Sequence, residues 1–126
     1  LNVGSRLPAY CTSMGRILLA ALDDDALHAY FGGVEMQAKT SRTLYTPETL
    51  LPCLVEIRRQ GWCIVDQELE VGLRSLAVPV RDSAGHVLAA LNVGTHAGRV
   101  SRAELESRFL PLLLEASREL SARLFT

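Results

Sequence analysis

The segment SLAVPVRDSAGHVLAALNVGT (residues 75–95) decides the expected fold, because its side chains alternate in size with a period of two. Residues 75–81 and 87–95 are predicted to form two strands, and the turn-rich sequence DSAG (residues 82–85) is predicted to join them in a hairpin. Successive side chains of a strand point to opposite faces of a sheet. We therefore expect an antiparallel sheet with two chemically different faces.

The two faces of this hairpin differ in side-chain size. One parity carries bulkier residues, which are Leu76, Val78, Val80, Val87, Ala89, Leu91 and Val93. The other parity carries Ser75, Ala77, Pro79, Leu88, Ala90, Asn92 and Gly94. A solvent-exposed face would usually carry Lys, Glu or Thr, so the smaller set is expected either to line a small-molecule pocket or to pack against a helix. The residues alone leave both possibilities open.

Helical patterns precede the hairpin. In AYCTSMGRILLAAL (residues 9–22), apolar residues recur at helical spacing after a hydroxyl cap at Thr12 or Ser13. The expected buried stripe of this helix is Met14, Ile17, Leu18 and Ala21. A short helix is expected after the aspartates 23–25 and ends at about Phe31.

Two further helices have clear start signals. Thr46-Pro47-Glu48 begins a helix that Gly61 ends, and its expected buried face is Leu50, Leu54 and Ile57. The capping box Ser101-Arg102-Ala103-Glu104 begins a long C-terminal helix, in which Pro111 is expected to cause a kink. Its expected buried face is Leu105, Phe109, Leu112, Leu113, Ala116, Leu120 and Leu124. This order of elements favours an α/β (α+β) fold with an antiparallel sheet flanked by helices.

The composition restricts the class of protein. The chain has 126 residues, of which 48% are hydrophobic and 21% charged, and its net charge is −1. These values are typical of one globular domain, and the absence of a basic excess argues against direct binding of nucleic acid. No apolar stretch approaches the roughly 20 residues of a membrane span, so a cytoplasmic location is expected. The scattered cysteines are expected to be reduced thiols.

Direct chemical functions find little support in the motifs. A phosphate-binding loop between Cys11 and Arg16 would be one residue too short for a thiol phosphatase, and Gly15 stands alone rather than in a glycine-rich phosphate loop. The three histidines and three cysteines lack the spacing of a zinc site. The acidic residues Asp66, Glu68 and Glu70 are most simply a solvated strand end. No catalytic residue, cofactor or metal is therefore assigned.

Three motifs together resemble a known family. LPAYCTSMGRILLAAL, GWCIVDQELEVGLRSLAVPVRD and AALNVGTH occur in this order and are similar to the C-terminal effector-binding domain of IclR-family transcriptional regulators. The resemblance spans residues 4–124 and is closest to the branch that regulates aromatic-acid catabolism through the β-ketoadipate pathway. It implies a GAF-like fold with a curved antiparallel sheet, flanking helices and an effector cavity on one sheet face.

The resemblance also implies a set of effector contacts, which are Ser13, Met14, Asp66, Ser75, Asn92 and Gly94. On this interpretation, the helix that starts at CTSMGR presents its amides and partial positive charge to an effector carboxylate. Gly15 would permit a close backbone approach, and Arg16 would point outward. Asp66 would accept a hydroxyl group of the effector, so that Asp66→Asn should weaken hydroxylated effectors more than others.

The implied function is that of a sensor rather than an enzyme. Residues 1–126 would form a single effector-binding and oligomerisation domain, dimeric or tetrameric, that binds a small organic acid. The resemblance implies that DNA would be bound only by a winged helix-turn-helix domain upstream of Leu1. The lack of an initiator Met separately suggests that an upstream part is missing. A small hydrolase using Cys11 and a purely structural dimerisation domain are the alternatives. A GAF-type nucleotide sensor is less favoured, because few aromatic residues are available for stacking.

Overall fold

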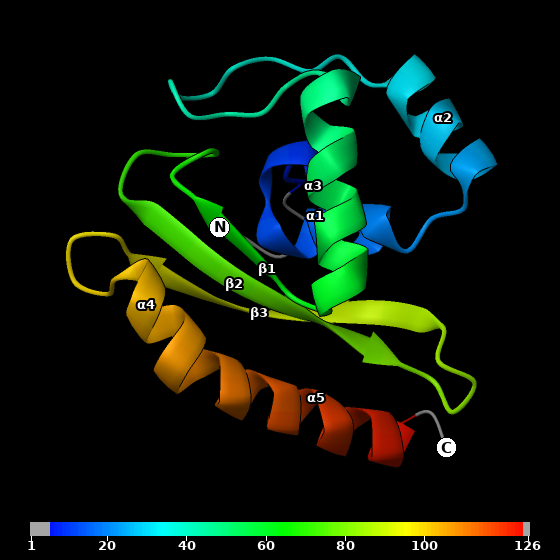
Figure 1. The fold of residues 1–126 in the computed structure, drawn as a ribbon, viewed down its shortest axis with the longest axis vertical. Helices are drawn as coiled ribbons and strands as arrows, with labels where there is room; N and C mark the ends of the chain where they lie inside the picture. Colours follow the sequence, from blue (N-terminus) through cyan, green and yellow to red (C-terminus); the bar gives the residue numbers. More distant parts are fainter. Residues whose placement is uncertain (1–5, 125–126) are drawn as a thin grey trace.

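The computed structural model describes residues 6–124 and arranges them in three layers (Figure 1). The middle layer is an antiparallel sheet in the order β1-β2-β3, with β1 at Cys63–Asp66, β2 at Leu73–Arg81 and β3 at Val87–His96. One face is covered by α1 (Ser13–Ala20) and α3 (Pro47–Gln60), and the other by α5 (Leu110–Leu124).

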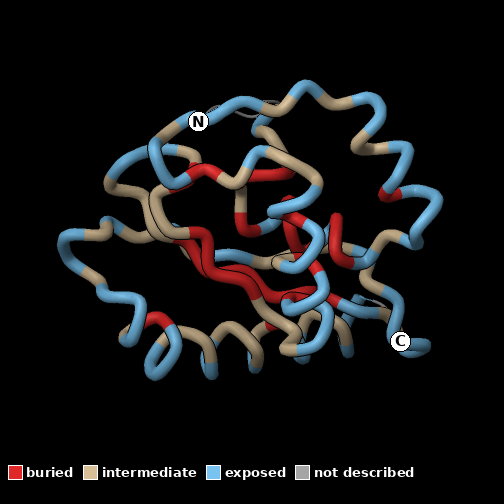
Figure 2. Tube along the Cα trace, turned by 45° about the horizontal axis from the view of Figure 1, so that its top comes forward, coloured by how far each residue is buried: buried red, intermediate tan, exposed pale blue. Residues whose placement is uncertain are grey.

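The remaining elements connect these layers. They are the 3-10 turn η1 (Ala9–Cys11), α2 (Asp24–Gly33), the short α4 (Arg102–Glu104) and the π-helical segment η2 (Leu105–Phe109). The expected fold class is confirmed, because an antiparallel sheet, flanking helices and a long C-terminal helix are all present. Figure 2 shows the buried residues running along the central strand and beneath the helical layer that contains α1.

Helix caps account for where the main helices begin and end. The Thr12 side chain accepts a hydrogen bond from the Gly15 amide at 3.1 Å, so Thr12 rather than Ser13 caps α1. Thr46 caps α3 in the same way, and Gly61 ends that helix with a positive φ of 83°. These local signals are readable in the sequence because each acts within one turn of its own helix.

The hairpin register places Ser75 opposite Gly94 and Ala77 opposite Asn92, as the size alternation requires. A β-bulge between Val80 and Arg81 then shifts the pairing, so that Arg81 lies opposite Val87. The assignment of Val87 to the bulky face is therefore wrong. It packs against the cluster under α1 and α3, because one extra residue in a strand moves the following side chain to the other face.

The buried stripe expected for α1 is also wrong. Ile17 is buried, but Met14, Leu18 and Ala21 are exposed. The reason is that α1 contacts both α3 and the sheet, so its buried arc is wide and includes Gly15, Arg16, Leu19 and Ala20. A single amphipathic stripe describes a helix with one neighbouring surface, and α1 has two.

The buried face of the long C-terminal helix agrees only in part with the one expected, because Leu105, Phe109 and Leu113 pack in one cluster whereas two of the expected leucines do not. Leu105 is fully buried against the sheet, but the side chains of Leu112 and Leu124 are 65% and 64% exposed. The π-helical segment η2 begins at Leu105, and its wider turns rotate the face that follows. Ser117 is buried instead and donates to the carbonyl oxygen of Pro79 at 2.6 Å.

Candidate functional site

A cavity of about 530 Å³ lies between the N-terminus of α1 and the sheet. Ligand pockets usually enclose roughly 300–1,000 Å³, so this cavity has room for a small molecule. Its lining comes from η1 and α1, from all three strands, and from the loop of residues 67–72 that joins β1 to β2. Five of the six predicted effector contacts line it, namely Ser13, Met14, Ser75, Asn92 and Gly94.

The helical wall of the cavity contains an unsatisfied polar group. Ser13 is only 2% exposed, and its Oγ is a buried side-chain polar atom without a hydrogen-bond partner among residues 6–124. Burying a hydroxyl group without a partner is unfavourable. Ser13 is the first residue of α1, where the backbone amides and the helix dipole favour a negative charge. This wall can therefore bind an anionic oxygen.

The floor of the cavity is formed by the small-residue face of the hairpin. Ser75 and Gly94 are paired across the strands, and Asn92 lies one pair further along the same face. A Cβ at Gly94 would lie 3.7 Å from the Leu73 side chain, which is an ordinary contact. The missing side chain at Gly94 therefore leaves space in the cavity rather than avoiding a clash.

Gly15 has a different role from the one expected. A Cβ at this position would lie 2.4 Å from both the Cα and the carbonyl oxygen of Ala9. The close approach that Gly15 permits is thus between α1 and η1, within the protein. It brings the start of η1 against α1, and Cys11 and Thr12, which follow in the chain, also line the cavity.

Arg16 does not point outward as expected. It is 2% exposed, and its guanidinium donates to both carboxylate oxygens of Glu68, with N–O distances of 2.8 and 2.5 Å. Its Nε donates to the Tyr10 carbonyl oxygen at 2.7 Å. Burial alone would lower the pKa of Arg16, but the hydrogen bond and charge of Glu68 raise it, so the guanidinium stays charged. Glu68 is correspondingly buried and is not part of a solvated strand end.

Asp66 is the predicted contact that the structure places outside the cavity lining. Its oxygens accept hydrogen bonds from Arg74 at 3.0 Å, Arg42 at 3.2 Å and Gln67 at 3.3 Å. Partial burial acts to raise the pKa of Asp66, but these hydrogen bonds and the two arginine charges outweigh it and lower the pKa. The carboxylate is thus ionised and engaged by the protein itself.

The cysteines do not form a nucleophilic centre in the structure. Cys11 lines the cavity but is fully buried, and desolvation raises the pKa of its thiol despite the nearby Arg16 charge. Burial raises the pKa of Cys63 to about 12. A thiol must ionise to attack, so both groups are poor nucleophiles near neutral pH. No observation favours the hydrolase alternative.

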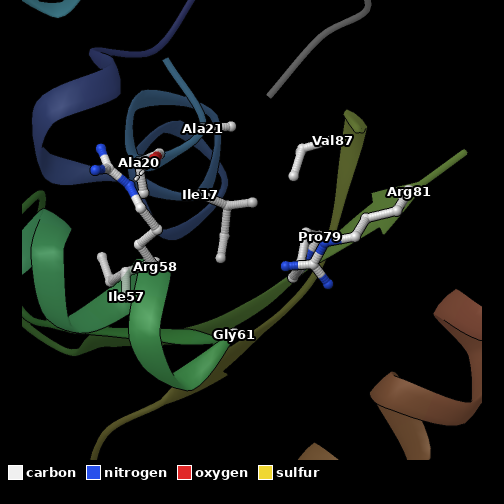
Figure 3. Close-up of a pocket in the computed structure, with 9 residues that line it drawn as sticks. All are labelled: Ile17, Ala20, Ala21, Ile57, Arg58, Gly61, Pro79, Arg81 and Val87. Atoms are coloured by element: carbon white, nitrogen blue, oxygen red, sulfur yellow. Dashed lines mark hydrogen bonds between the residues drawn. The ribbon is translucent and has the colours of Figure 1, made fainter. Parts of the chain in front are cut away.

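Residues 6–124 offer little support for a metal site, a membrane-spanning helix or a second cavity as large as the one at the N-terminus of α1. No group of three His, Cys, Asp or Glu side chains in this part of the chain is close enough to hold a metal ion. None of its helices combines the length and apolar character needed to cross a membrane. A second hollow lies at the other end of α1 but encloses only about 50 Å³ (Figure 3).

Several cavity residues were not expected from the sequence. Leu73 shares the parity of Ser75, so extending the strand alternation by two residues would have identified it. Leu69 and Glu70 lie in the 67–72 loop, which has no periodicity that could place them. The pairing of Arg16 with Glu68 spans 52 positions of sequence and had no local signal.

The architecture and the cavity together define an α/β domain of the ligand-binding class. The chain belongs to the family described as bacterial transcriptional regulator IclR, C-terminal, whose model matches residues 1–122. It is 66% identical over 125 residues to the Pca regulon regulatory protein of Pseudomonas putida, covering 99% of this chain and 43% of that protein. The chain spans less than half the length of this protein and of other curated relatives that it matches.

Solved structures of related domains have the same fold. The inducer-binding domain of PobR from Acinetobacter, a double mutant in complex with 3-hydroxybenzoic acid, superposes with a TM-score of 0.89 at 34% identity. That comparison covers 94% of this chain and 67% of the other. The C-terminal domain of KdgR from Escherichia coli superposes with a TM-score of 0.87 at 39% identity, covering 94% and 72% respectively. These relatives are transcriptional regulators rather than enzymes.

Proposed function

We propose that this chain binds a small organic acid and thereby controls DNA binding by a winged helix-turn-helix domain elsewhere in the same protein. The effector would be an aromatic acid or a ring-cleavage keto acid or dicarboxylic acid such as β-ketoadipate. The cavity volume supports a ligand of this size. The similarity to the Pca regulon regulatory protein and to the PobR domain solved with an aromatic acid supports this chemical class.

The observation that carries the proposal is the unpartnered Ser13 Oγ at the N-terminus of α1. An effector carboxylate at this position would accept from the Ser13 hydroxyl and from the first amides of the helix. Ser75 and Asn92 supply a hydroxyl and an amide on the opposite wall, where they can bind a second polar group. Met14 and Gly94 then determine the shape of the cavity between these two walls.

The proposed contact with Asp66 is less direct. Its carboxylate already accepts hydrogen bonds from Arg42 and Arg74, so an effector hydroxyl would have to replace one of them. Alternatively, Asp66 acts through Arg74, whose neighbours Leu73 and Ser75 both line the cavity. The prediction that Asp66→Asn discriminates against hydroxylated effectors separates these possibilities, because an indirect role should weaken all effectors equally.

Regulation requires that the effector favour one conformation of the protein. A difference of about 1–3 kcal/mol in binding free energy between two states is typical of such coupling. We also propose a dimeric or tetrameric assembly, because a regulator acts on DNA through paired half-sites. We propose a cytoplasmic location as well, where the DNA of a bacterial cell lies. The basic residues needed for DNA contact are proposed to lie outside this chain, whose net charge is −1.

A thermal-shift titration of the 126-residue chain tests the proposal. The panel is 4-hydroxybenzoate, protocatechuate, cis,cis-muconate, β-ketoadipate, pyruvate and glyoxylate. A ligand at about 100 times its Kd adds about 2.7 kcal/mol to the free energy of unfolding, which is a shift of several degrees. A saturable shift that Ser13→Ala weakens is expected with one chemical class. The absence of any shift would contradict the proposal and favour a purely structural role.

A further inference from the structure

The buried ion pair of Arg16 and Glu68 lies behind the cavity lining rather than within it. Arg16 is in the first turn of α1, whose residues Ser13 and Met14 form one wall of the cavity. Glu68 directly precedes Leu69 and Glu70, which form the loop wall. The pair therefore joins two walls that are far apart in sequence, and it does so without contacting the cavity itself.

The geometry of the pair fixes both position and orientation. The guanidinium and the carboxylate make two parallel hydrogen bonds, and Arg16 makes a third to the Tyr10 carbonyl oxygen. Glu68 also accepts from the Leu44 amide at 2.8 Å, and its carbonyl oxygen accepts from the Thr43 hydroxyl at 2.5 Å. Both oxygens of the Glu68 carboxylate are thus bound by defined parts of the fold.

Charge pairs of this kind contribute more to geometry than to net stability. Removing two charges from water costs about as much as their attraction returns, so well-packed apolar residues are often equally stabilising. Two apolar side chains could, however, slide past each other, whereas the two directional hydrogen bonds of a guanidinium–carboxylate pair fix its relative position. The 67–72 loop has no secondary structure of its own, and it contains positive φ angles at Gln67 (58°) and Gly72 (91°). Backbone hydrogen bonds hold its two ends, from the Gln67 amide to Leu73 and from the Ala97 amide to Gly72, and the side chain of Glu68 ties its middle to Arg16.

We propose that Arg16 and Glu68 are a positioning pair that holds the 67–72 loop at a set distance from the N-terminus of α1 and so sets the affinity of the effector cavity. This inference rests on the proposed function for its ligand, but the placement of the loop can be measured without a ligand. Neither residue is proposed to touch the effector. Their effect is transmitted through Leu69 and Glu70 on one side and through the first turn of α1 on the other.

The test replaces the pair by apolar residues of similar volume in the double variant Arg16→Met/Glu68→Met. The matched control is Arg59→Met/Glu56→Met, which removes an exposed ion pair within α3. Arg16→Lys keeps the charge but cannot form the fork, and it serves as the second variant if the double variant does not fold. Two quantities are measured on the full 126-residue chain: the affinity for the acid of the panel that binds most tightly, and amide hydrogen exchange.

The expected result is specific to the loop. The amides of Gln67 and Gly72, which are hydrogen-bonded within the loop, should exchange faster in the double variant, while those of β2 stay unchanged. Affinity should fall by about tenfold, the lower end of what the loss of a supporting partner costs a metal site. The control variant should leave both quantities unchanged.

The proposal would be overturned if the double variant bound the acid as tightly as wild type does and its loop amides exchanged at the wild-type rate. The same result in Arg16→Lys would overturn it where that variant is used. A uniform increase in exchange over loop and β2 would also overturn it, because the pair would then act only through global stability. If wild type binds none of the acids, the proposed function fails, and loop exchange alone decides whether the pair positions the loop.

Discussion

The interface between α1 and strands β2 and β3 is open at one end and closely packed at the other. At one end, a cavity of about 530 Å³ separates them, and at the other the space shrinks to about 50 Å³. Figure 3 shows Ile17 of α1 filling the narrow end between α3 and the strand residues Pro79 and Val87. We refer to these as the cavity end and the packed end.

The difference lies in what covers the sheet rather than in the sheet itself. Both ends of this face carry small side chains, such as Ser75 and Gly94 at one end and Pro79 with its cross-strand partner Ala90 at the other. At the packed end, the β-bulge turns Val87 toward α1, and α3 closes the space with Ile57. At the cavity end, the N-terminus of α1 and the 67–72 loop line the space above the sheet, and Glu68 of that loop is paired with Arg16. A small-residue face therefore permits a cavity, and its covering segments decide whether one forms.

The largest expected effect is at the contact between α1 and η1. In Gly15→Ala, the new methyl group would overlap the backbone of Ala9, which can move only by displacing η1. We expect a loss of about 3 kcal/mol in the free energy of unfolding, measured by urea denaturation. Gly32→Ala is the control, because its Cβ would meet open space, and it should stabilise α2 by about 0.5–1 kcal/mol. Equal stabilities for the two variants would contradict the close approach.

At the packed end, Ile17→Val should lower stability without changing ligand binding. Ile17 is 3% exposed, and removing one methyl group from a buried isoleucine costs about 1 kcal/mol. Effector affinity, measured by calorimetry, should remain at the wild-type value because the cavity end is unaltered. A substantial fall in affinity would show that the two ends are coupled and would break the distinction between them.

The ion pairs that Asp66 makes with Arg42 and Arg74 should make a small, pH-dependent contribution to the free energy of unfolding. The folded state lowers the pKa of Asp66, so its stabilising contribution is present above the unfolded pKa of about 3.9 and is lost as the pH falls through the lower folded value. Asp66→Asn should thus be less stable than wild type at pH 7, by about 1 kcal/mol or less, and the difference should vanish once the pH lies below the folded pKa. A difference that persists at the lowest pH would rule out this cause.

The smallest effect on stability is expected at the cavity floor. Asn92 is exposed within the cavity, so Asn92→Leu should change the free energy of unfolding by no more than about 0.5 kcal/mol. The same substitution fills the floor and removes an amide, and it should abolish the thermal shift given by the effector. If the variant retained the thermal shift, the effector would have to bind elsewhere than at this part of the sheet.

Local signals in the sequence accounted for the elements and for much of the candidate site. The hydroxyl caps, Gly61 and the alternation of residues 75–80 and 89–95 each act over a few positions, and the structure agrees with them. The small-residue parity selected Ser75, Asn92 and Gly94, which lie together in the cavity. Asp66 could not be judged in this way, because its partner Arg42 lies on a distant segment.

What the sequence determined by itself is the set of strands and helices, the size difference between the two sheet faces, and the family to which the chain belongs. Only the tertiary structure decided which part of the small-residue face became a cavity, and that Arg16 is buried against Glu68. The physical reason is the separation in sequence over which each interaction acts. Capping and alternation depend on neighbouring residues, whereas burial and ion pairing depend on which distant segments cover a given surface.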